Sequence, residues 1–233
     1  MAMIDVSRIP DFERRKTKYS PIAALLDEVF GWPDWRPFLP PVDELVDCIL
    51  SQSTNDRNRD RAFAALKTAF PTWEAVMNAP TEDVIAAIRP AGLANQKGPR
   101  IQNVLRRIEV ERGELNIDFL ADLPLEQAKA WLTALDGVGP KTAAIVLCFA
   151  FQRPAFPVDT HIHRIGQRIG FLPQGISADA AHVVMEAIVP PEDHFAFHLN
   201  LIRLGREICE ARRPRCEICP LIAHCDFYQA ASK

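Results

Sequence analysis

The chain has 233 residues, of which 48% are hydrophobic and 24% are charged, and its formal net charge is −3. This composition is typical of a soluble globular protein with room for one large domain or two smaller ones. The small negative charge does not exclude nucleic acid as a ligand, because phosphate binding depends on local charge. No apolar run is long enough to span a membrane, and no secretory signal begins the sequence, so we expect a cytoplasmic protein without membrane contacts.

Apolar residues recur at three- and four-residue spacing through most of the chain, and the alternation typical of strands is nearly absent. This pattern predicts an all-α fold of roughly ten or eleven short helices. The clearest start signals predict helices at 20–30, 81–88, 123–135 and 177–189, with Thr81 as the cap of the second and Ser177 as the cap of the fourth. The proline-rich stretch 31–41 predicts a linker, and 152–154 predicts a second, weaker joint.

Four of the six cysteines lie near the C-terminus with six, two and five residues between them, at Cys209, Cys216, Cys219 and Cys225. Because cysteines stay reduced in the cytoplasm, this cluster predicts a metal centre before disulfides. One short Cys-x-x-Cys spacing in a single loop suits an iron–sulfur cube better than structural zinc, which usually uses two such pairs. Cys48 and Cys148 lie in apolar helical stretches and are predicted to be core residues.

The stretch 135–143, Leu-Asp-Gly-Val-Gly-Pro-Lys-Thr-Ala, joins the end of one predicted helix to the start of the next. Two glycines around Val138 would expose backbone N–H groups at a helix start, where a phosphate binds favourably. Such a turn by itself is more often a simple helix connection. Lys141 follows it closely, and Asp159 begins another predicted helix eighteen residues later, so we expect an amine and a carboxylate to share one cleft.

The hairpin, the Val-Asp-Thr-His-Ile stretch 158–162 and the four-cysteine loop, in this order, resemble endonuclease III of the helix-hairpin-helix DNA glycosylase superfamily. The resemblance covers nearly the whole chain. It implies a six-helix barrel domain with the hairpin at 34–153, and a second domain, formed by 1–33 and 154–233, that carries a [4Fe-4S] cluster. It also implies a monomer that binds double-stranded DNA, with damaged bases or abasic sites, in a groove between the two domains.

By position, Lys141 matches the family's nucleophilic lysine and Asp159 its essential aspartate. Leu93 matches the family's apolar wedge, which fills the gap left by a flipped base. Ser53 stands where the family typically has glutamine, with Gln52 one place earlier, and either side chain could reach the orphaned base. The further residues that we expect at the DNA are Gly137, Val138, Gly139, Thr142 and His161.

The hairpin departs from the family at three positions. Asp136 stands where proline is usual, Pro140 where a basic residue is usual, and Ala144 where asparagine is usual. An added anion and a lost cation beside a phosphate predict weaker DNA binding or slower turnover than in a typical member.

Three functions are compatible with these residues. The first is a bifunctional DNA glycosylase and abasic-site lyase that excises oxidised pyrimidines in base excision repair, with Lys141 forming a Schiff base to the deoxyribose. The second is a monofunctional glycosylase for mismatched or damaged bases, in which Lys141 is vestigial. The third is a non-catalytic binder of damaged DNA. The resemblance favours the first, because relatives that only hydrolyse the glycosidic bond lack the lysine.

Overall fold

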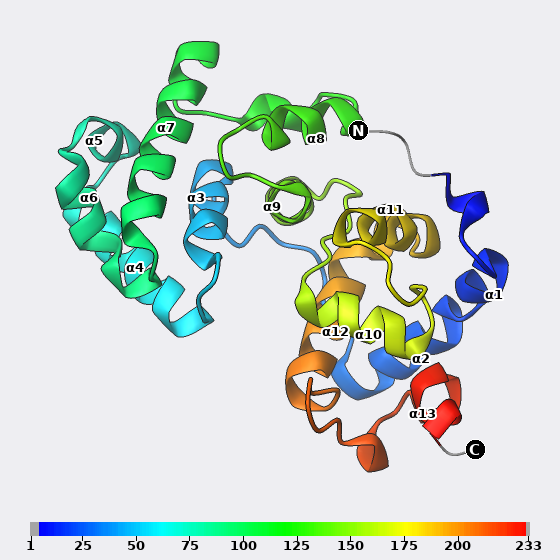
Figure 1. Cartoon of the computed structure of the whole chain (residues 1–233). Coiled ribbons are helices and arrows are strands. Elements are labelled where there is room, and N and C mark those ends of the chain that lie inside the picture. The colour runs from blue at the N-terminus through cyan, green and yellow to red at the C-terminus, as the bar shows by residue number, and fades with distance from the viewer. Residues whose placement is uncertain (1–4, 232–233) are drawn as a thin grey trace. The chain divides into compact units, whose positions relative to one another are not determined.

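The computed structural model describes residues 5–231, whose course Figure 1 shows. Over these residues the chain forms thirteen α-helices and no strand, which confirms the all-α prediction. There are more helices than predicted because four of them have only six residues, too few to leave a clear period in the sequence. Each described helix is too short or too polar to cross a lipid bilayer.

The chain divides into two compact units. The first, which we term the hairpin unit, is the continuous segment Pro37–Arg153, and the second, the cysteine unit, combines the segments on either side of it. The first joint falls inside the predicted linker 31–41, where the chain has no helix before Pro41. The assignment of these units to a barrel domain and an iron–sulfur domain stays a prediction.

The hairpin unit contains seven α-helices, drawn from light blue to green in Figure 1. They are α3 (Pro41–Ser51), α4 (Asp56–Ala69), α5 (Trp73–Asn78), α6 (Thr81–Ile88), α7 (Ala94–Arg112), α8 (Leu125–Thr133) and α9 (Pro140–Ile145). A 3-10 turn, Arg89–Ala91, follows α6, and a π-helical stretch, Val146–Ala150, extends α9. Apolar side chains at helical spacing on α3 and α7, such as Leu45, Ile49 and Ile101, are fully buried and form part of the core.

The cysteine unit contains the other six α-helices. They are α1 (Phe12–Thr17), α2 (Tyr19–Phe30), α10 (Thr160–Ile169), α11 (Ala178–Ile188), α12 (His194–Glu207) and α13 (Asp226–Ala231). Its core is rich in aromatic residues, and Phe171 and Phe197 pack edge to face with ring centroids 5.9 Å apart. Lys18, just before α2, donates hydrogen bonds to Asp226 and to the Ile169 carbonyl, so it ties the start of α13 to the end of α10.

The predicted helix boundaries agree with the observed ones to within two residues. Ser177 caps α11 as predicted, because its hydroxyl accepts a hydrogen bond from the Ala180 N–H at 3.2 Å. Thr81 was predicted to cap α6, and that prediction is wrong. Thr81 is instead the first helical residue, and its hydroxyl donates to Gln102 of α7 at 2.8 Å, which ties the two helices together.

Candidate functional site

The turn between α8 and α9 has the form that its glycines predict. Gly137 adopts a left-handed φ of +69°, and the Val138 N–H donates to the Leu135 carbonyl at 3.1 Å. The Val138 side chain is buried and anchors the turn in the core, whereas both glycines are exposed. Pro140 occupies the first position of α9, where its missing N–H has no intrahelical partner to lose.

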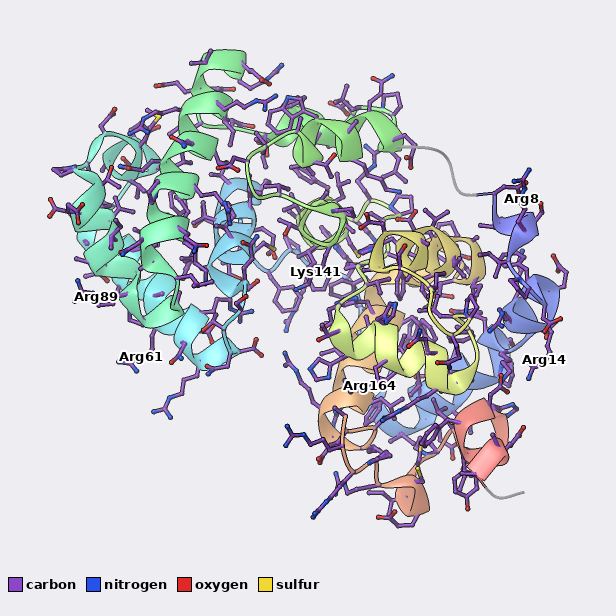
Figure 2. All side chains as sticks on the ribbon, in the orientation of Figure 1. Arg8, Arg14, Arg61, Arg89, Lys141 and Arg164 are labelled. Atoms are coloured by element: carbon purple, nitrogen blue, oxygen red, sulfur yellow. The ribbon has the colours of Figure 1, made fainter. Side chains whose placement is uncertain are left out.

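Lys141 lies in the first turn of α9 and its side chain is exposed, and Figure 2 labels it there. Thr142, the next residue, is buried. Burial raises the pKa of Cys48 on α3 well above its usual range. The positive charge of Lys141 acts in the opposite direction and lowers this pKa. The amine is therefore open to solvent while its helix packs close to α3.

Two carboxyl groups on α3 share the surroundings of Cys48. Glu44 is only 6% exposed, and burial, followed by the charge of Asp47, raises its pKa to about 7. Burial also raises the pKa of Asp47 to about 6, although Arg59, whose Nε lies 3.4 Å from Asp47 Oδ1, opposes the shift. The sequence patterns above do not single out these groups, although Asp43, Glu44 and Asp47 stand together on a largely apolar helix.

The two loops predicted to enter the DNA present Ser53 and Leu93 to solvent. Both residues have a left-handed backbone conformation, with φ of +53° and +50°, which residues other than glycine rarely adopt. Leu93 is 51% exposed, so its apolar side chain is accessible to a ligand. Both side chains are thus accessible at a loop tip, and their wedge roles stay predictions.

Gln52 is held by the hairpin instead of projecting freely. Its Nε2 donates to the Gly137 carbonyl at 2.9 Å, and its Oε1 accepts from Arg100 Nη1 at 3.1 Å. The Arg100 side chain packs so closely on Gly137 that a Cβ on Gly137 would overlap it. The Nε of Arg100 lies 3.9 Å from Asp136 Oδ2. The anion that Asp136 adds to the hairpin therefore has a cationic neighbour.

Asp159 and His161 lie in the cysteine unit, at the start of α10. Asp159 caps this helix, since its Oδ1 accepts from the Ile162 N–H at 2.8 Å. His161 Nδ1 lies 3.3 Å from Arg164 Nη2. Because Lys141 belongs to the hairpin unit, the meeting of its amine with Asp159 stays a prediction.

The four clustered cysteines lie after α12 in the cysteine unit, and all four are partly buried free thiols. Burial raises the pKa of Cys219, and the thiols of Cys209, Cys216 and Cys225 raise it further, so the four groups are close enough to repel one another as thiolates. Arg168 of α10 donates to Cys209 Sγ at 3.3 Å and also to the carbonyls of Glu210 and Ala211.

The donor set fits an iron–sulfur cluster by its chemistry, because four neighbouring thiols and a guanidinium donor can hold and partly neutralise a thiolate-ligated centre. Within residues 5–231, no three or more His, Cys, Asp or Glu side chains are arranged so that they could hold a single metal ion.

Comparison with known proteins places the chain in a family. The family model for HhH-GPD superfamily base excision DNA repair proteins matches residues 46–191. A relative from Arabidopsis thaliana, provisionally named a DNA glycosylase, is 37% identical and covers 80% of this chain and 67% of its own length. Endonuclease III from Thermotoga maritima is 33% identical, covering 83% of this chain and 86% of its own. The fold also matches a trapped covalent intermediate of endonuclease III with DNA, with a TM-score of 0.76, 26% identity and coverage of 93% and 99%.

The chain therefore belongs to the HhH-GPD superfamily of base excision DNA repair proteins, as a member of its endonuclease III family of DNA glycosylases.

Proposed function

We propose that this protein is a bifunctional DNA glycosylase and abasic-site lyase that acts on oxidised pyrimidines in double-stranded DNA. The observation that carries the proposal is the position of Lys141, an exposed amine in the first turn of the helix that follows the Gly-Val-Gly hairpin. The resemblance links this position to the lyase step, because relatives that only hydrolyse the glycosidic bond lack the lysine.

Lys141 would act as the nucleophile. Its neutral amine attacks C1′ of the deoxyribose, the bond from C1′ to the base breaks, and the base leaves with the bonding electrons and takes up a proton. The nitrogen then loses a proton, and its lone pair forms a double bond to C1′ as the bond from C1′ to the ring oxygen O4′ breaks. O4′ takes up a proton, so the sugar ring opens and a protonated imine remains. Loss of a proton from C2′ then allows the bond between C3′ and the 3′ phosphate oxygen to break, so that the phosphate leaves by β-elimination.

Asp159 would stabilise the positive charge that develops on the sugar as the base departs, and it would take part in proton transfer. Its cap bond to Ile162 uses Oδ1, which leaves Oδ2 for this role. A carboxylate fixed by a helix start needs little reorganisation when the charge appears.

Cys209, Cys216, Cys219 and Cys225 would hold a [4Fe-4S] cluster. Once bound, the cluster would supply covalent cross-links within the C-terminal loop. Arg168 would keep the start of that loop in place through its bonds to Cys209 and to two carbonyls. The exposed Arg212 and Arg213 follow directly and would face the DNA phosphates.

The test is reduction with borohydride in the presence of duplex DNA that contains an abasic site, which traps an imine as a stable adduct. We expect the wild type and Lys16→Ala, which lacks an exposed lysine of α1, to form the adduct, and Lys141→Ala to form none. Excision of an oxidised pyrimidine without an adduct would identify a monofunctional glycosylase. Binding without excision or adduct would identify a non-catalytic binder.

A further inference from the structure

A lysine that the function above does not use is buried in the hairpin unit. Lys97, in the first turn of α7, is 1% exposed. Its Nζ donates two hydrogen bonds of 2.8 Å, one to the Leu50 carbonyl and one to the Ala91 carbonyl. One ammonium group thus joins segments that are 47 and 6 residues away in the chain.

This position is unfavourable for a cation unless the two carbonyls compensate. Burial, and next the charge of Arg100, lower the pKa of Lys97, and the start of a helix repels positive charge. The two carbonyls, in contrast, lie at the C-terminal ends of helical segments. Leu50 lies in the last turn of α3, and Ala91 ends the 3-10 turn after α6, so both are helix-end acceptors that attract a cation.

Each of these carbonyls lies directly before one of the two DNA loops. Ser53 follows Leu50 by three residues, and Leu93 follows Ala91 by two. Among residues 5–231, four residues other than glycine have a left-handed backbone, and two of them are Ser53 and Leu93. Lys97 therefore fixes the chain just where it turns into each strained, exposed tip.

We propose that Lys97 is a positioning residue for opening the DNA duplex: its ammonium fastens the 51–53 loop and the 92–93 loop together, so that Ser53 and Leu93 enter the base stack as one preformed wedge. This inference rests on the proposed function, since it assumes that these loops meet DNA. Displacing a base costs unstacking energy, and a wedge that is already ordered adds no further ordering cost.

The hydrogen bonds of Gln52 indicate which polar residue forms the tip. Both ends of its amide are engaged, by the Gly137 carbonyl and by Arg100, so Gln52 braces the 51–53 loop against the hairpin. Ser53 is exposed and carries the left-handed turn, so it is the residue that faces the orphaned base.

The test measures unstacking directly, with 2-aminopurine placed opposite a tetrahydrofuran analogue of an abasic site in duplex DNA, which cannot form an imine, at saturating protein. Lys97→Met keeps the length of the buried chain and removes the donors. We expect it to lower the equilibrium constant for unstacking in the complex about tenfold or more, as the loss of a charged hydrogen bond implies. Lys97→Gln, which keeps an N–H donor with a shorter reach, should give a smaller loss, and Lys16→Met should match the wild type.

Leu93→Ala completes the experiment as a double-mutant cycle. If Lys97 acts through the wedge, adding Lys97→Met to Leu93→Ala will cause little further loss. Unstacking by folded Lys97→Met or Lys97→Gln that equals the wild type would overturn the inference, and so would full additivity with Leu93→Ala. The fluorescence does not depend on imine formation. Failure of the proposed lyase function would appear separately, as wild-type protein that unstacks the base but forms no borohydride adduct.

Discussion

The two units of this protein stabilise their interiors in different ways. Apart from histidine, the described residues include two buried charged side chains, Glu44 and Lys97, and both lie in the hairpin unit. The buried polar residues described in the cysteine unit are three histidines and Asn200, in a core that also contains Phe156, Phe171 and Phe197. Both interiors are apolar, but among the described residues only the hairpin unit also buries acidic and basic side chains other than histidine. Electrostatic changes should therefore act mainly on the hairpin unit, whereas loss of an aromatic ring tests the core of the cysteine unit.

The largest expected effect on stability is in the aromatic core. Phe197 is fully buried and contacts the rings of Tyr19, Phe156 and Phe171. Phe197→Ala should lower the free energy of unfolding by about 3–5 kcal/mol through lost burial and a residual cavity. Phe227→Ala, at an exposed ring, is the control and should cost below about 1 kcal/mol. Chemical denaturation measures both, and equal losses would contradict the aromatic core as the support of this unit.

Alanine substitution at the two glycines of the hairpin should affect stability and DNA binding to different extents. Gly137→Ala places a Cβ at φ +69° and against Arg100, so it should cost about 1–3 kcal/mol of stability and weaken DNA binding. Gly139→Ala has an extended φ of −95° and open space around the new Cβ, and its stability should be almost unchanged. Thermal unfolding and DNA titration of the pair test this. Similar behaviour of the two variants would show that the hairpin does not depend on the turn at Gly137.

The buried carboxyl of the hairpin unit makes stability depend on pH. The pKa of Glu44 is about 7 in the folded protein against a usual 4.5, so folding favours its protonated form. The free energy of unfolding should then fall as pH rises from about 4.5 to about 7 and level off above that. Glu44→Gln should be about 1–2 kcal/mol more stable than the wild type at pH 8, with a smaller difference at pH 5. Glu82→Gln, at an exposed position, is the control, and a gain that does not change with pH would contradict the account.

The smallest effect is expected at Asp136. Its carboxylate is mostly exposed and lies 3.9 Å from Arg100, so the repulsion that it adds to a phosphate is partly offset. Asp136→Asn should tighten DNA binding about two- to threefold at low salt, and the gain should disappear at high salt. Binding isotherms at two salt concentrations measure this. A large gain that persists at high salt would mean that Arg100 does not neutralise the anion.

The features that the sequence predicts are those set by neighbouring residues. Gly137 and Val138 take the predicted turn conformation, and the four cysteines are mutual neighbours, because short spacing determines each. The bonds of Lys97 and Gln52 could not be predicted in this way, because their partners lie up to 85 residues apart and become neighbours only when the helices pack. In the sequence, Lys97 looks like any other basic residue of the chain. Only the structure shows that its side chain is buried.

Identifying the residue that carries the borohydride adduct would test whether Lys141 is the nucleophile. Wild-type protein would be reduced with borohydride on abasic duplex DNA, digested with protease and nuclease, and analysed by mass spectrometry. We expect a sugar remnant on Lys141 and on no other lysine. An adduct on a different lysine, or none in protein that binds the DNA fully, would contradict it.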